Sequence, residues 1–138
     1  MPTLLTHILV KPEAIPRWEK ILADLVARTE ADEPERLRYE YWRGDKPGAY
    51  YALLSYPTAY AFYRHQGSET HDKYLDDFTK MFADIRFEWI DPVARGGSGL
   101  PATENDPLPP EAPEKIRAQV GLYPILISEW WKAARKTS

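Results

Sequence analysis

Residues 37–56 read LRYEYWRGDKPGAYYALLSY, and this stretch decides the fold. Two runs rich in apolar and aromatic residues, Leu37–Arg43 and Ala49–Tyr56, are typical of β-strands. Between them lies the segment Gly44–Gly48, whose glycines, aspartate and proline are typical of a turn. The stretch therefore predicts an antiparallel hairpin.

Both faces of this hairpin carry aromatic side chains. Side chains alternate between the two faces of a strand, so Tyr39 and Tyr41 share one face and Trp42 lies on the other. In the second run Tyr50 and Tyr51 likewise belong to opposite faces. We therefore expect both faces to be covered, which a single layer of helices cannot do alone.

The chain before the hairpin predicts a strand and a helix. Leu4–Val10 is short, apolar and rich in strand-forming residues. From Ile15 to about Thr29, apolar residues recur with the spacing of an amphipathic helix. The acidic, proline-containing stretch Glu30–Glu35 is expected to end that helix.

The chain after the hairpin predicts a second helix and a fourth strand. Pro57 and Thr58 open a helical region that runs to about Ala83, with a break near Gly67 and a cap on its second half, Ser68 or Thr70. The alternating run Ile85–Ile90 is expected to form the last strand. The order β-α-β-β-α-β defines a ferredoxin-like α+β fold.

The remaining residues predict an extension. We divide the chain into a domain over residues 1–93, a Gly/Pro-rich linker over 94–113 and a C-terminal helical extension over 114–138. Arg95–Gly99 is expected to be flexible, and Pro124 is expected to kink or divide the terminal helix. That helix should cover the bare sheet face, a partner subunit or a pocket entrance.

Composition excludes several classes of protein. The chain has 138 residues, a net charge of −3 and no stripe of Lys and Arg, so a nucleic-acid partner is not expected. No cysteine is present, which excludes disulfides, thiolate catalysis and Cys-based metal sites. No signal peptide and no apolar run of about 18 residues is visible, so we expect a cytoplasmic protein without a membrane segment.

Three histidines are the candidates for chemistry. His65 and His71 are six residues apart, which is about 600° of helical rotation, or roughly 120° from a common face. On one unbroken helix the two side chains would not converge, although the break at Gly67 could change this. The sequence also has no motif that would supply a third metal ligand. A metal site is therefore not expected. His7 shares a face with Leu5 and Leu9 and is expected to be structural.

A family resemblance now becomes specific. Residues 55–71, SYPTAYAFYRHQGSETH, followed by Tyr74 and Phe78, resemble the helical signature of the antibiotic biosynthesis monooxygenase family. The run Leu37–Glu40 is also similar to the second strand of that family. The resemblance covers about residues 3–93.

The resemblance implies a dimeric α+β barrel, in which two subunits pack sheet against sheet and each holds a pocket between its sheet and helices. It implies a cofactor-independent oxygenase of the quinol or anthrone type, acting on a small aromatic or polyketide-like substrate. Such family members deprotonate the substrate to an anion that reduces O₂ directly, without metal or flavin. Three alternatives stay open: a non-redox cyclase or lyase, a haem-binding or haem-degrading relative, and a non-catalytic ligand-binding dimer.

On this basis His65 is the candidate catalytic base, because the pKa of histidine is near neutral. The alternative interpretation of His65 is a structural histidine at a helix end that is hydrogen-bonded to backbone. The alternative interpretation of His71 is a structural surface residue beside Asp72. The candidate substrate-binding residues are mainly aromatic, because aromatic rings stack on flat ligands. They are Tyr39, Tyr41, Trp42, Tyr51, Tyr56, Trp89 and His71.

Overall fold

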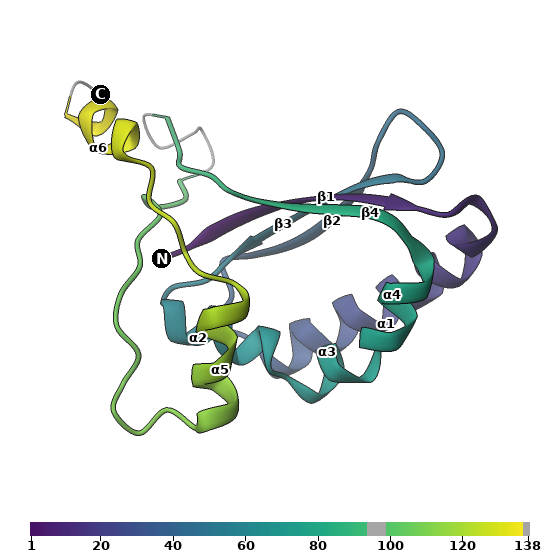
Figure 1. Cartoon of the computed structure of the whole chain (residues 1–138), viewed down its shortest axis with the longest axis horizontal. Helices are drawn as coiled ribbons and strands as arrows, with labels where there is room; N and C mark the ends of the chain where they lie inside the picture. The colour runs from purple at the N-terminus through teal and green to yellow at the C-terminus, as the bar shows by residue number, and fades with distance from the viewer. Residues whose placement is uncertain (94–98, 137–138) are drawn as a thin grey trace.

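The computed structural model describes residues 1–93 and 99–136, and its centre is one four-stranded sheet (Figure 1). The strand order is β2-β3-β1-β4, and all neighbouring strands are antiparallel. This is the ferredoxin-like arrangement predicted from the sequence. The strands are β1 (Thr3–Val10), β2 (Arg38–Arg43), β3 (Ala49–Ser55) and β4 (Phe82–Trp89).

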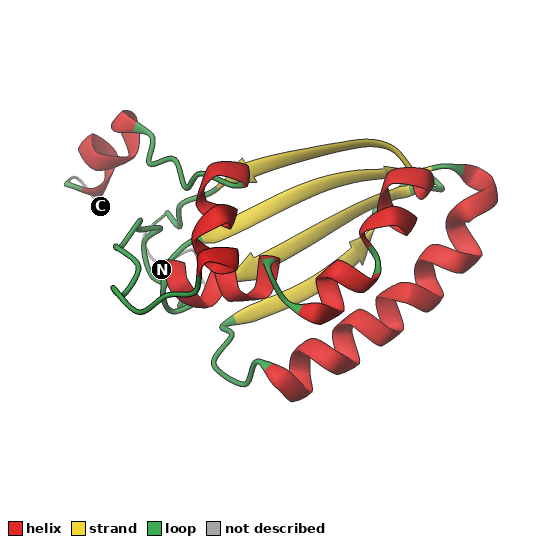
Figure 2. Ribbon diagram, turned by 60° about the horizontal axis from the view of Figure 1, so that its bottom comes forward, coloured by secondary structure: helices red, strands yellow, loops and turns green. Residues whose placement is uncertain are grey.

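Helices cover one face of this sheet (Figure 2). A 3₁₀ turn, η1 (Pro12–Ala14), leads into α1 (Ile15–Asp32), which extends three residues beyond the predicted end. The α1 residues Trp18, Leu22 and Leu25 are buried against the sheet. No helix in the described ranges is long and apolar enough to cross a membrane.

The second predicted helical region is divided into α2 (Ala59–Gln66), α3 (Glu69–Lys73) and α4 (Leu75–Met81). The Thr58 hydroxyl caps α2 by accepting the Ala61 N–H at 3.0 Å. Of the two candidate caps for the second half it is Ser68 that acts, because its hydroxyl accepts the His71 N–H at 3.2 Å. The predicted break near Gly67 is thus confirmed.

The opposite face of the sheet is not covered by a helix of the described residues. In Figure 1 every helix except α6 lies below the sheet, and α6 stands beyond one of its ends. Trp42 and Tyr51 are 59% and 41% exposed on this outer face, and Leu9 is exposed beside them. Within one chain, therefore, only one of the two aromatic faces is covered.

The C-terminal extension packs on α2. It forms α5 (Glu114–Leu122) and α6 (Glu129–Arg135), divided around Pro124 as predicted. A Cβ atom on Gly67 would lie 3.0 Å from the Ile116 Cδ1 atom, so glycine allows α5 to approach closely. At the far end, Arg135 donates to both carboxylate oxygens of Asp91 at 2.5 and 2.9 Å.

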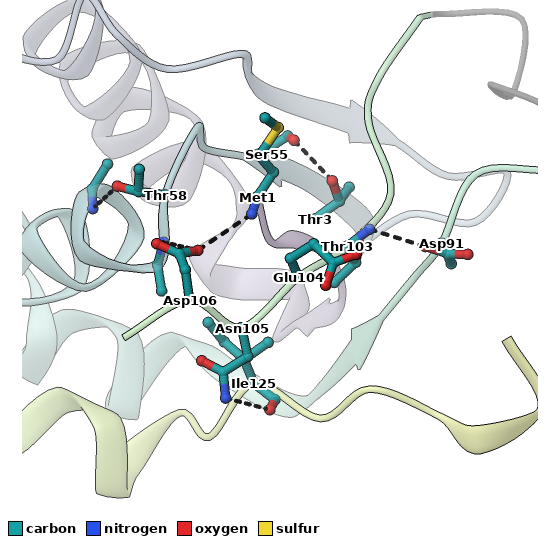
Figure 3. A network of polar contacts seen from close by, with 12 residues as sticks. Met1, Thr3, Ser55, Thr58, Asp91, Thr103, Glu104, Asn105, Asp106 and Ile125 are labelled. Carbon is teal, nitrogen blue, oxygen red and sulfur yellow. Dashed lines mark hydrogen bonds and ion pairs between the residues drawn. The ribbon is translucent and has the colours of Figure 1, made fainter. Parts of the chain in front are cut away.

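The segment that leads into the extension is fastened to the domain (Figure 3). The predicted flexible stretch Arg95–Gly99 lies, except for Gly99, outside the described residues. Thr103 is fully buried, and its N–H donates to Asp91 at 2.9 Å while its hydroxyl donates to the Ile90 carbonyl. The division into domain, linker and extension stays a prediction.

Asp106 joins three parts of the chain at the start of α2. Its carboxylate accepts the Ala59 N–H at 3.1 Å and lies 3.5 Å from the ammonium group of Met1 (Figure 3). The first N–H groups of a helix have no partner within the helix, so this carboxylate satisfies one of them from a distant segment.

We predict that Asp106→Ala lowers the free energy of unfolding by about 1 kcal/mol, the usual cost of losing a helix cap. Urea denaturation followed by circular dichroism measures this. The matched control is Glu111→Ala, which removes an exposed carboxylate from the same segment. Equal stability of the two variants would contradict the capping role.

Candidate active site

A cavity of about 530 Å³ lies between the inner face of the sheet and α3 and α4. Strand residues Thr6, Ile8 and Ala52 form one wall, and the helical residues Leu75 and Phe78 contribute to the other. Most of its lining is apolar or aromatic. Small-molecule sites are typically of this size and character.

His65 is a buried ionisable group on the wall of this cavity. It sits in the last turn of α2, its side chain is 4% exposed, and it lines the cavity. Its Nδ1 atom lies 3.0 and 3.1 Å from the two carboxylate oxygens of Glu33. His65 is therefore hydrogen-bonded to a side chain, and not to a backbone group as in its alternative interpretation.

Glu33 has a second partner. The Tyr56 hydroxyl, fully buried, donates to the Glu33 Oε1 atom at 2.8 Å. Burial and the neighbouring Glu33 raise the pKa of Tyr56 far above its usual range, so this hydroxyl stays a donor. Glu33 itself follows the C-terminus of α1, where the Glu33 N–H donates to the Thr29 carbonyl at 2.9 Å.

The break at Gly67 brings His71 back towards His65. The two ring centroids are 5.9 Å apart, and the His71 ring also packs edge-on against Phe78 at 5.8 Å. The His71 Nδ1 atom is buried and has no hydrogen-bond partner among the described residues. Burial, and then the neighbouring His65, lowers the pKa of His71 to about 4. His71 is therefore a neutral ring at the cavity wall.

Two predicted tyrosines complete the polar part of the cavity. Tyr39 and Tyr41 both line it, and their hydroxyl oxygens are 3.4 Å apart. The Tyr39 ring packs against His65 with centroids 5.1 Å apart. Burial raises the pKa of both hydroxyls, that of Tyr39 more strongly, so both remain neutral. One hydroxyl of the pair donates to the other, which leaves one O–H to donate to a ligand.

The structure does not bring all the predicted residues together. Tyr56 lies behind His65, and its ring centroid is 5.5 Å from that of His65. Trp42 and Tyr51 belong to the outer face, where Tyr51 packs against His7. The Trp89 ring packs against Phe62, and its indole N–H donates to the Pro124 carbonyl at 2.9 Å.

Sequence reasoning missed several residues of the site. The sequence predicts only that Glu33 belongs to the stretch that ends α1. No local pattern connects it with a histidine 32 residues later. Phe87 and Ile85 of β4 lie exposed on the inner face at the mouth of the cavity. Tyr123 of the extension also lines the cavity and packs on Phe87 with centroids 5.5 Å apart.

Among residues 1–93 and 99–136, no group of three or more His, Asp and Glu side chains is arranged to hold a metal ion. Glu33 is the carboxylate beside His65 and His71, and its oxygens are already hydrogen-bonded to His65 and Tyr56.

Fold and cavity together define a class: a ferredoxin-like α+β protein with a largely apolar and aromatic cavity and a buried histidine on the cavity wall. The family model for antibiotic biosynthesis monooxygenase matches residues 1–77. This chain therefore belongs to the antibiotic biosynthesis monooxygenase family, as the sequence resemblance indicated.

Solved structures agree with this assignment. A protein of Caulobacter crescentus that is assigned to the same monooxygenases is 26% identical, with a TM-score of 0.62 over 67% of this chain and 89% of that one. The protein PA3566 of Pseudomonas aeruginosa is 21% identical, with a TM-score of 0.59 over 64% of this chain and 91% of that one; at this identity it shows the fold alone. None of the curated proteins compared with the chain is significantly similar to it.

We predict that His71 makes the folded state less stable in mild acid. The pKa of His71 is about 4 in the folded protein and near 6.5 when unfolded, so between these values the unfolded chain binds more protons. The free energy of unfolding should therefore fall as pH drops from 6.5 to 4, by up to about 1.4 kcal/mol per pH unit from this group. Urea denaturation of wild type and His71→Gln measures the difference; identical slopes would contradict the prediction.

Proposed function

We propose that this protein is a cofactor-independent oxygenase that oxidises an anthrone- or quinol-type aromatic substrate with O₂, using neither metal nor flavin. The observation that carries the proposal is the His65 imidazole on the cavity wall, with its Nδ1 atom at hydrogen-bond distance from Glu33. Family membership and the aromatic lining of the cavity support it.

The chemistry balances without an external reductant. His65 removes one proton from the CH₂ group of an anthrone, and the resulting carbanion passes electrons to O₂ and forms a C–O bond. The protonated His65 returns its proton to the peroxide. Loss of the second C–H proton then breaks the O–O bond, which leaves a carbonyl on the ring and releases water. One CH₂ and one O₂ thus become one C=O and one H₂O.

The cavity supplies what this sequence of steps needs. The neutral pair of Tyr39 and Tyr41 has one O–H that can donate to the oxygen of the substrate anion and stabilise it. The partly exposed side chains of Phe78 and Phe87 provide apolar surface for contact with flat rings. The volume of about 530 Å³ accommodates a small polycyclic molecule.

We predict O₂ consumption when anthrone is added to the protein in the presence of EDTA, above the spontaneous rate measured without protein. His65→Ala should lower kcat/KM by roughly 10²- to 10⁴-fold, the usual contribution of a general base. The matched control is Arg64→Ala, since Arg64 is the neighbouring residue on α2 but points outwards and pairs with Glu35 at 3.2 Å.

Other outcomes of this experiment contradict the proposal. If neither anthrone nor 1,4-naphthohydroquinone causes O₂ consumption, the proposed oxygenase function is wrong. Turnover without O₂ uptake would favour the cyclase or lyase. A Soret band that forms with haem and is lost in His65→Ala would favour the haem-binding alternative.

We also propose that two copies pair through the outer face of the sheet. Trp42, Tyr51 and Leu9 leave an exposed apolar surface there, and large exposed patches of this kind mark interaction sites. A symmetric dimer would place the same patch of both subunits in contact and cover the second aromatic face.

We predict that sedimentation equilibrium gives twice the 16.0 kDa of one chain, and that Trp42→Glu shifts the protein to the monomer mass. A charge at this position would lose its contact with water when the two sheets pair, so it opposes association. Circular dichroism controls for folding of the variant. A wild-type protein that sediments as a monomer would overturn the pairing.

A further inference from the structure

Glu33 stands between the buried histidine and solvent. On one side it contacts His65, which lines the cavity. On the other side it borders a separate surface depression of about 510 Å³, together with Glu35, Arg64 and Lys73. The Glu33 side chain is 14% exposed and lines this depression, whereas it is not among the residues that line the cavity.

The geometry restricts the proton on His65. A neutral imidazole carries one N–H, and the nitrogen that carries it is set by the partner of each nitrogen. A carboxylate offers only acceptors, and both Glu33 oxygens face the Nδ1 atom at 3.0 and 3.1 Å. Tyr56 fixes the carboxylate in this orientation by donating to its Oε1 atom.

We propose that Glu33 is a positioning residue that holds the proton of neutral His65 on Nδ1 and so presents the unprotonated Nε2 to the cavity. Only an unprotonated nitrogen can act as a base, so this tautomer makes His65 competent to remove a substrate proton. When Nε2 accepts that proton, the adjacent carboxylate offsets the charge that forms on the ring. The catalytic consequence rests on the function proposed above, whereas the tautomer itself does not.

The tautomer can be read directly in the wild-type protein. Two-bond ¹H–¹⁵N correlation spectra distinguish the two tautomers, and the three histidines of the chain can be assigned by single replacements. At a pH where the ring is neutral, we expect His65 to show a protonated Nδ1 and an unprotonated Nε2. A protonated Nε2 would overturn the proposal without any variant being made.

Two matched variants then test the cause. Glu33→Leu removes the acceptor, so the Nδ1–H form of His65 should lose population to the Nε2–H form, and kcat/KM on anthrone should fall on the order of 10²-fold. Glu35→Leu makes the same change two residues away, in the same depression but against Arg64, and should leave both quantities unchanged. An unchanged His65 tautomer in Glu33→Leu, or an equal effect of Glu35→Leu, would overturn the proposal.

The two proposals fail in different ways. If the Nδ1–H tautomer is present and depends on Glu33 but no substrate consumes O₂, the oxygenase function is wrong and the role of Glu33 stands. If O₂ is consumed and depends on His65 but the tautomer does not depend on Glu33, the positioning role is wrong and the function stands.

Discussion

The interruption of the helical region at Gly67 is the constraint on which the site depends. Gly67 is where Ile116 of the extension approaches the end of α2, and the Ser68 hydroxyl restarts the chain as α3. A continuous helix would turn His71 away from His65 by roughly 120°. The restart instead leaves their rings 5.9 Å apart at one wall of one cavity. The cap at Ser68 thus brings together two histidines that one continuous helix would keep apart.

Burial then assigns different electrostatic roles to the groups at that wall. Tyr39 and Tyr41 stay protonated because desolvation disfavours their anions, and His71 stays neutral because desolvation disfavours its cation. Neutral groups of this kind can bond a ligand without competing for its proton. His65 differs from them, since it alone in this group bonds a carboxylate through its ring. The cavity therefore combines one histidine paired with a carboxylate, two neutral tyrosine hydroxyls and a neutral histidine ring.

Strand alternation and turn chemistry were sufficient to predict the sheet, because each strand carries its own pattern. The boundaries were less predictable: β4 begins at Phe82 and not at Ile85, since its first residues pair with Val10 and Leu9 after a register shift that no local pattern indicates. In the site, the sequence identified His65, Tyr39 and Tyr41 as candidates. It could not identify Glu33, whose importance depends on the packing of the turn after α1 against α2.

The C-terminal extension contributes to the lining of the cavity. The family model ends at residue 77, so it does not include the extension. The inner face of the edge strand β4 is exposed at Phe87, which leaves the cavity open along that edge. Tyr123 packs edge-on against Phe87 there, and its backbone carbonyl accepts the Tyr63 hydroxyl of α2 at 2.8 Å. A segment that the family model does not match is thereby anchored to the helix that carries His65, and it contributes Tyr123 to the lining of the same cavity.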